Sequence, residues 1–285
     1  GTQTNFTVIA AALRPHQCVL CADTGHINVH ESGAVEACGH KVSAIPSPDG
    51  KLTARQIEEA WHAHWDDETR EHMPQPRMVY ISQPTELGTI YSRKELQEIS
   101  GVCRRRGLYL YMDGARLGYG LCDEDNDLDL PAIASLCDAF YIGGTKVGAL
   151  FGEALVLRHE ALKEDFRYIA KQKGGRLAKG RLLGIQFLEL FRDGLYFRLG
   201  AHADRLAVML RDFCRSRGLS LPFSSGTNQQ FVTMPDSVLE ELGRKYGFAY
   251  LRREDETHST VRFCMSWATR EEDVRELMAD IARLC

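Results

Sequence analysis

The sequence predicts an α/β fold in which a mostly parallel sheet forms a large domain and a small α+β domain follows at the C-terminus. Three observations support this prediction. Short apolar runs alternate with amphipathic stretches up to residue 158, about 60 mainly helical residues follow, and short strands return after residue 219. We expect the large domain, with a helical connector, to span residues 1–200 and the small domain to span residues 201–285.

Six apolar runs in the first part of the chain have the length of strands and are rich in β-branched or aromatic residues. Because they are nearly continuously apolar and alternate with helices, we expect a mostly parallel sheet that is covered on both faces. The six runs are 18–22, 41–45, 78–82, 108–112, 139–143 and 154–158.

Several helices have readable starting points. A Ser or Thr followed three residues later by Gln or Glu can form a capping box, in which both side chains accept hydrogen bonds from free backbone N–H groups. The pairs that predict such starts are Thr53 with Gln56, Ser92 with Glu95 and Thr269 with Glu272.

The C-terminal part contains three further runs that predict strands, at 229–234, 248–252 and 260–267. In the last of these runs the side chains alternate, so that one face is apolar and the other carries Arg262. An arginine on that face can reach across the domain cleft and bind a carboxylate, although a solvent-exposed arginine is the alternative. The expected apolar face consists of Val261, Phe263, Met265 and Trp267.

The overall composition argues against several kinds of partner. The 35 basic and 39 acidic residues are mixed along the chain and give a net charge of -4, which disfavours nucleic acid and anionic membrane surfaces. No apolar stretch approaches the roughly 20 residues that span a bilayer. The nine cysteines are odd in number, with Cys18 and Cys21 as a lone Cys-x-x-Cys pair, so we expect reduced thiols, a cytoplasmic protein and no metal site.

Two neighbouring strand ends carry charged residues. The segment "YLYMDGARLGYG" places Asp113, and then Arg116, directly after an apolar strand, where ligand crevices of open α/β sheets lie. Lys146 follows the next strand among glycines, and an amine beside an apolar wall becomes a nucleophile. Taken separately, Asp113 can be a turn residue with Arg116 exposed, and Lys146 can bind a phosphate or extend to solvent.

Together, the carboxylate and the lysine match the two protein groups that pyridoxal 5'-phosphate needs. Asp113 would keep the ring nitrogen protonated, and Lys146 would hold the aldehyde carbon. The opening "GTQTN" precedes a helical stretch, so the N–H groups near Gly1, Thr2 and Gln3 can form a cradle for the phosphate.

Five segments resemble the low-specificity L-threonine aldolases and related β-eliminating lyases, which use pyridoxal phosphate and have the aspartate aminotransferase-like fold type I. The likeness extends over nearly the whole chain, and the last two segments together are the most specific. In order, the segments are "GTQTN", "TGHINVHESGAVEACGHKV", "QPTELGTIYS", "YMDGARLGYGL" and "GGTKVGALFGEALV".

This resemblance implies a role for each residue of the site. Lys146 would be the Schiff-base lysine and Asp113 the partner of the pyridine nitrogen. Arg116 would lie near the phenolic oxygen, and His26 would stack on the ring and assist proton transfer at the substrate hydroxyl. Arg262 would bind the substrate carboxylate. Gly1, Thr2 and Gln3 would contact the phosphate.

The chain departs from the family pattern in two places. Many threonine aldolases have a second histidine after the third strand, where this chain reads Gln83 to Leu87, so Glu86 is a substitute for the aldol base. Family members also carry roughly 60 or more residues before the phosphate loop. We therefore expect either a fragment of a longer protein or a truncated, non-catalytic protein that binds pyridoxal phosphate.

The basic, glycine-rich segment 171–184 is the counterpart of a family region that reaches a neighbouring subunit. Lys179 or Arg181 would then contact the neighbour's phosphate in a homodimer or homotetramer, and a solvated helix start is the alternative. The expected reaction is cleavage of the Cα–Cβ bond of threonine or allo-threonine to glycine and acetaldehyde. β-Elimination or transamination of another amino acid is the alternative chemistry.

Overall fold

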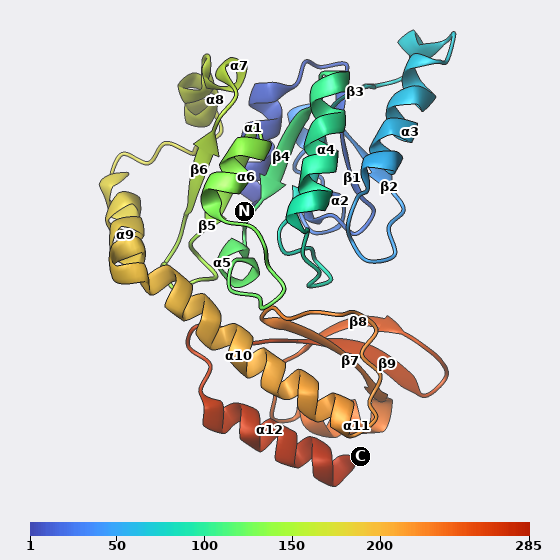
Figure 1. Ribbon diagram of the computed structural model, residues 1–285, viewed down its shortest axis with the longest axis vertical. Coiled ribbons are helices and arrows are strands. Elements are labelled where there is room, and N and C mark those ends of the chain that lie inside the picture. The colour runs from blue at the N-terminus through green and yellow to red at the C-terminus, as the bar shows by residue number, and fades with distance from the viewer.

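The computed structural model describes all 285 residues and contains two sheets (Figure 1). A six-stranded sheet has the order β2-β1-β3-β4-β5-β6, and a three-stranded sheet has the order β7-β9-β8. The first five strands are parallel, whereas β6 pairs with β5 in the antiparallel sense. The mostly parallel sheet followed by a small antiparallel sheet confirms the predicted fold class.

The six strands of the large sheet coincide with the six predicted runs to within three residues. They are β1 (Gln17–Ala22), β2 (Lys41–Ile45), β3 (Gln75–Ser82), β4 (Tyr109–Asp113), β5 (Ala139–Gly143) and β6 (Glu153–Leu157).

Helices cover both faces of this sheet, as the continuously apolar strands require. Val19 and Met78 pack with Val8 and Ile9 of the first helix on one face, whereas residues such as Ile81 belong to the larger core on the other face. The helices up to the connector are α1 (Thr2–Ala12), α2 (His26–Val29), α3 (Ala54–Trp65), α4 (Arg93–Arg106), α5 (Leu117–Gly120), α6 (Leu130–Leu136), α7 (Glu160–Lys163), α8 (Phe166–Gln172) and α9 (Arg181–Phe191). Three short 3-10 helices occupy Glu36–Cys38, Arg70–His72 and Arg192–Gly194.

The predicted helix starts are correct in two of the three cases. Thr53 and Ser92 both form complete capping boxes. The last helix, α12 (Glu271–Leu284), instead begins after Arg270 without a side-chain cap, so the predicted start at Thr269 is wrong. The Thr269 hydroxyl accepts a hydrogen bond from the backbone N–H of Ser266 and serves the preceding turn.

The small sheet contains β7 (Gln229–Pro235), β8 (Ala249–Arg253) and β9 (His258–Cys264), with α11 (Asp236–Gly243) between the first two. Val261, Phe263 and Met265 are buried, as predicted. Trp267 lies beyond the end of β9 and is 45% exposed, so its assignment to the apolar face was wrong.

The long helix α10 (Leu195–Ser216) runs from the large sheet to the small one and packs against α5, β7 and α12 (Figure 1). It passes through residues 200 and 201 without a break, so the division into domains at that point stays a prediction. None of the helices is long and apolar enough to cross a lipid bilayer.

Candidate active site

The carboxyl ends of β3, β4 and β5 meet at a small cavity. Ser82 and Asp113 are register partners at the ends of β3 and β4, and Lys146 follows β5. The cavity brings together five of the residues predicted for the site: His26, Glu86, Asp113, Arg116 and Lys146. Its remaining lining residues are Ser82, Pro84, Thr85 and Ala115.

Asp113 is buried and fully hydrogen-bonded. Its Oδ1 accepts from the Tyr141 hydroxyl and, at 2.9 Å, from the backbone N–H of Ala115. Its Oδ2 accepts from the Tyr80 hydroxyl at 2.6 Å and from Asn5 Nδ2 at 2.9 Å. Burial alone would raise the pKa of Asp113, but these four donors outweigh it and hold the pKa below its ordinary value. The group is therefore a carboxylate at neutral pH.

Lys146 lies in the loop after β5 and pairs with no carboxylate. Burial, followed by the charge of Arg116, lowers the pKa of Lys146 to about 8, and the charges of Asp113, Glu153 and Glu86 oppose this shift only in part. The Tyr119 hydroxyl donates to the backbone carbonyl of Lys146 and holds the loop. An amine with this pKa is mostly protonated at pH 7 but keeps about a tenth of its population in the neutral, nucleophilic form.

The close approach of two loops places Lys146 beside Arg116. A Cβ added at Gly143 would collide with the backbone of Gly114 and Ala115, so glycine is required where the loop after β5 passes the loop after β4. This contact fixes the spacing between the lysine and the arginine.

Arg116 directly precedes α5, makes no capping hydrogen bond with its side chain, and carries a positive charge without a counterion. Its Nε is buried without a hydrogen-bond partner, and no carboxylate lies within ion-pair distance of its guanidinium. An unpaired guanidinium next to a lysine is costly unless an anion binds there.

Arg262 reaches toward this region from β9 of the small sheet. Its Nη1 donates to Gln229 Oε1 at 3.1 Å, while its Nε is buried without a partner. Arg262 does not line the cavity at Lys146, but it lies close to it. Burial lowers the pKa of His30, and the charges of His26, Arg262 and Lys146 lower it further, so His30 lies within reach of both Arg262 and Lys146.

His26 begins α2 and is held at both its backbone and its ring. Its backbone N–H donates to Glu86 Oε1 at 3.1 Å, and its Nδ1 lies 2.7 Å from Glu31 Oε1. Glu86 Oε1 also accepts from the Ser82 hydroxyl at 2.7 Å. Burial raises the pKa of Glu86, and the Asp113 charge adds to this effect.

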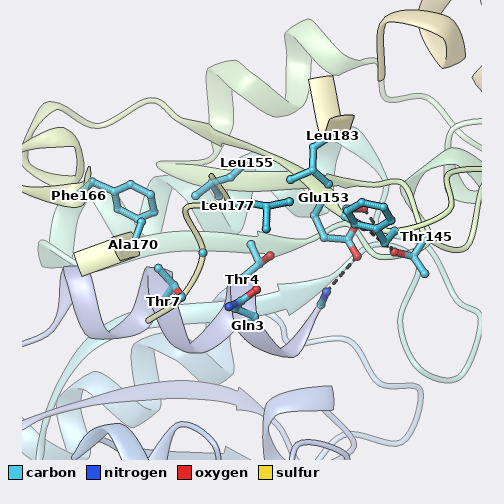
Figure 2. Close-up of a pocket in the computed structure, with 15 residues that line it drawn as sticks. Gln3, Thr4, Thr7, Thr145, Glu153, Leu155, Phe166, Ala170, Leu177 and Leu183 are labelled. Carbon is cyan, nitrogen blue, oxygen red and sulfur yellow. Dashed lines mark hydrogen bonds and ion pairs between the residues drawn. The ribbon is translucent and has the colours of Figure 1, made fainter. Parts of the chain in front are cut away.

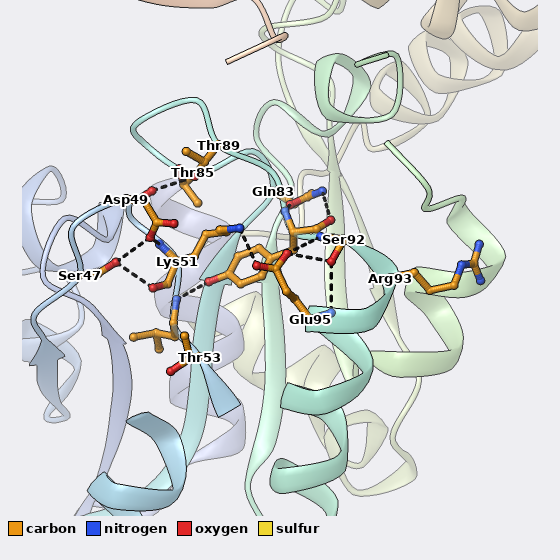
Figure 3. A network of polar contacts seen from close by, with 12 residues as sticks. Ser47, Asp49, Lys51, Thr53, Gln83, Thr85, Thr89, Ser92, Arg93 and Glu95 are labelled. Atoms are coloured by element: carbon orange, nitrogen blue, oxygen red, sulfur yellow. Dashed lines mark hydrogen bonds and ion pairs between the residues drawn. The ribbon is translucent and has the colours of Figure 1, made fainter. Parts of the chain in front are cut away.

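A polar network fastens the loop that carries Glu86 (Figure 3). The Thr85 and Thr89 hydroxyls lie 2.7 Å apart, and Thr89 donates to the Asp49 carbonyl at 2.8 Å. Lys51, two residues further on, extends to Glu95 at the start of α4, at 2.6 Å. The loop is therefore tied to its neighbours on both sides.

The predicted phosphate residues lie at a different cavity from Lys146. Gly1 and Gln3 line a cavity of about 460 Å³ between α1, β6 and the segment 174–183 (Figure 2). The amino group of Gly1 pairs with Glu153 Oε1 at 3.0 Å, and Gln3 Nε2 donates to the Lys173 carbonyl at 2.9 Å. Thr2 begins α1 and lines neither cavity.

The start of α1 nevertheless lies close to Tyr141, one of the residues that hydrogen-bond to Asp113. A Cβ added at Gly1 would lie 3.8 Å from the Tyr141 hydroxyl, which donates to Asp113. The free N–H groups of the first helical turn therefore lie one side chain away from the cavity.

Lys179 and Arg181 are exposed at the start of α9, and neither reaches the cavity at Lys146. Their surroundings include exposed apolar side chains of the same helix. Leu182, Ile185 and Leu188 are 49%, 52% and 61% exposed.

Sequence reasoning missed the polar residues that hold the predicted ones. Asn5, Glu31, Tyr80 and Tyr141 hydrogen-bond to Asp113 or His26 from other elements. A signal was available in the two tyrosines, because they occupy inner strands that flank the strand ending in Asp113.

The chain is similar to several proteins of known activity. A family described as beta-eliminating lyase matches residues 1–237. The low specificity L-threonine aldolase of Pseudomonas sp. (strain NCIMB 10558) is 35% identical over 288 residues, which cover 99% of this chain and 80% of that protein. The Pseudomonas aeruginosa protein with the same description is 34% identical over 285 residues, with coverage of 99% and 80%.

Solved structures agree with this result. Leishmania major threonine aldolase has a TM-score of 0.96 and 44% identity, covering 100% of this chain and 82% of that chain. Thermus thermophilus aspartate aminotransferase has a TM-score of 0.71 at 16% identity, covering 99% and 74%, so it shares the fold alone. These neighbours confirm the predicted fold type I arrangement.

Proposed function

The chain belongs to the β-eliminating lyase family, and we propose that it is a pyridoxal phosphate-dependent aldehyde-lyase that cleaves the Cα–Cβ bond of β-hydroxy-α-amino acids. Threonine or allo-threonine would give glycine and acetaldehyde. The threonine aldolases of Pseudomonas and Leishmania major support this substrate class. The observation that carries the proposal is the single cavity in which Lys146, Asp113, Arg116 and His26 meet.

The residues present fit pyridoxal phosphate. The buried Nε of Arg116 lacks a partner and Lys146 lacks a counterion, so the cavity offers positive charge to an anionic ligand. Asp113 is held as a carboxylate and would bind the protonated ring nitrogen, and Lys146 would bond to the aldehyde carbon. The first turn of α1, at Gly1, Thr2 and Gln3, would serve the phosphate.

When bound, pyridoxal phosphate supplies an electron sink for the charge that develops at Cα. The residues of this chain supply orientation and proton transfer. Arg262, with its Nε free, would hold the substrate carboxylate in a two-pronged contact. His26 would accept the proton of the β-hydroxyl at its free ring nitrogen, and Glu86 would hold the backbone of His26 in place.

A second copy of the chain would cover α9. The exposed Leu182, Ile185 and Leu188 lie on the helix that Arg181 begins, and apolar surface of this kind favours association. Lys179 or Arg181 would then reach the neighbour's phosphate in a homodimer or homotetramer. Size-exclusion chromatography with light scattering, on the wild type and on Leu188→Lys, tests this assembly.

The cysteines suggest a reducing compartment. All nine are free thiols, and five of them are buried. Such a chain fits the cytoplasm, where thiols stay reduced.

Product analysis tests the proposed reaction. Wild-type protein supplied with pyridoxal phosphate should release equal amounts of acetaldehyde and glycine from threonine. Lys146→Ala should lose the visible absorbance of the bound aldehyde and at least about a thousandfold of the rate. Lys163→Ala, an exposed lysine paired with Glu160, is the matched control.

The products also separate the alternatives. Pyruvate and ammonia from serine or cysteine would indicate β-elimination instead. Cofactor absorbance without any product would indicate a binding protein, and either result would contradict the proposed cleavage.

A further inference from the structure

We propose that Glu31 is a positioning residue that keeps a proton on Nδ1 of His26 and so leaves Nε2 free to accept the substrate proton. This inference rests on the proposed function. It gives a role to Glu31, for which the resemblance implied none.

The contact between the two side chains fixes which nitrogen carries the proton. His26 Nδ1 lies 2.7 Å from Glu31 Oε1, and the Glu31 side chain is 0% exposed, whereas that of His26 is 29% exposed. An ionised carboxylate can only accept hydrogen bonds, so Nδ1 must be the donor. In a neutral imidazole the other nitrogen, Nε2, is then the acceptor.

Glu31 has no other charged partner. No lysine or arginine lies within ion-pair distance of it, and its Oε2 is buried without any hydrogen-bond partner. A buried carboxylate with so few donors gains most from the nearest group that can carry positive charge, which is His26. The His26 ring is therefore the one side chain in contact with Glu31 that can carry a positive charge.

The backbone brings Glu31 into this buried place. Ser32 and Gly33, which follow it directly, both have left-handed backbone angles, with φ of 52° and 70°. Such an angle is unfavourable for serine, because its Cβ crowds the backbone in this region. This turn follows α2, and Glu31 directly before it contacts Asn5 of α1 and His26.

Asn5 links this pair to Asp113. Its Nδ2 donates to Glu31 Oε1 at 2.7 Å and to Asp113 Oδ2 at 2.9 Å. Its Oδ1 accepts from the Tyr111 hydroxyl at 2.8 Å, which fixes the orientation of the amide. One buried amide therefore sets the spacing between the carboxylate behind His26 and the carboxylate at the end of β4.

Nitrogen NMR on the cofactor-free protein tests the inference without reference to turnover. With ¹⁵N-labelled histidine, and with His26→Gln to assign the signals, the wild-type ring should show a protonated Nδ1 and an unprotonated Nε2. A wild-type ring with its proton on Nε2 would overturn the proposal even if every Glu31 variant failed to fold.

Glu31→Leu provides the second measurement. Leucine cannot accept a hydrogen bond, so nothing at this position holds the proton on Nδ1. The ring should then populate the Nε2–H tautomer, and kcat should fall by about a hundredfold, with KM changed by less than about threefold. Glu36→Leu, at an exposed glutamate in the same segment, is the matched control and should change neither.

The two readouts also separate this inference from the proposed reaction. A changed tautomer in Glu31→Leu with unchanged kcat would contradict the positioning role. A wild type with the expected tautomer but no aldehyde release would contradict the reaction alone.

Discussion

Asp113 and Lys146 lie at neighbouring strand ends, yet the protein treats their charges in opposite ways. Asp113 receives four hydrogen bonds, and they hold its pKa below the ordinary value despite burial. Lys146 receives no counterion, and Arg116 next to it has a buried Nε without a partner. The negative charge is stabilised by the protein itself, whereas the positive charges need a ligand. It follows that the site binds an anionic ligand. The Asp113 carboxylate is already ionised and hydrogen-bonded before that ligand binds.

Asp113→Asn removes the charge of the fully hydrogen-bonded carboxylate and should have the largest effect on activity. The amide keeps the shape but removes the charge that would hold the ring nitrogen protonated, so kcat should fall by about a hundredfold or more. Cleavage of threonine, followed by coupled reduction of acetaldehyde, measures this. Asp127→Asn, an exposed aspartate that binds the N–H of Arg93, is the control. Unchanged kcat would show that Asp113 only supports the fold.

Arg262→Lys tests a cation whose buried Nε has no hydrogen-bond partner. A lysine cannot make the two parallel contacts that a guanidinium makes with a carboxylate, so KM for threonine should rise by about ten- to a hundredfold. Steady-state kinetics measure the change, and Arg252→Lys, an exposed arginine paired with Glu254, should leave KM unchanged. An effect on kcat alone would place Arg262 away from the carboxylate.

Lys146→Met should stabilise the cofactor-free protein, because it removes the uncompensated charge. The folded pKa of about 8 lies below the ordinary value of 10.5, so the folded state binds fewer protons than the unfolded state between these pH values. The wild type therefore carries the full penalty below pH 8 and loses it as the pH rises toward 10.5. The variant should gain roughly 1 to 3 kcal/mol at pH 7.

Urea denaturation at pH 7 and pH 10 measures this gain. The difference between Lys146→Met and wild type should shrink at the higher pH. A variant that is less stable than wild type at pH 7 would show that Lys146 has a partner that balances its charge.

Glu86→Gln should have the smallest effect, because an amide oxygen can still accept the hydrogen bonds from His26 and Ser82. We expect kcat to fall by less than about tenfold. A fall of about a hundredfold or more would identify Glu86 itself as the base that accepts the hydroxyl proton. The measurement is kcat for threonine across pH 6 to pH 9, with Glu71→Gln, an exposed glutamate on the 3-10 helix Arg70–His72, as control.

Local patterns predicted the strands and two helix starts, because the information for each lies within a few residues. The continuous apolar runs gave the parallel sheet, and the capping boxes at Thr53 and Ser92 require only neighbouring side chains. The start at Thr269 failed because its hydroxyl is used by the turn before it. That competition within one turn is not visible from spacing.

The candidate site was predictable only in part. Its charged residues follow strand ends, but the residues that hydrogen-bond to them do not. Asp113 and Lys146 were readable from the sheet order. The contacts of Asn5 with Glu31 and Asp113 join positions 26 and 108 residues apart, so no local pattern reports them. Gly1 and Gln3 were placed at the cofactor by the helix start that follows them and by the resemblance, and here they line the neighbouring cavity.

The location of Arg262 has a consequence for protein engineering. This arginine stands on the small sheet and makes one side-chain contact, with Gln229 on the adjacent strand, whereas Asp113 and its four donors belong to the large sheet and the segments around it. Given the roles proposed for Arg262 and Asp113, we expect variation confined to β7 and β9 to alter which carboxylate-bearing compounds bind while leaving the surroundings of Asp113 unchanged. A library of variants at positions of these two strands would therefore test new substrates while the residues around Asp113 stay the same.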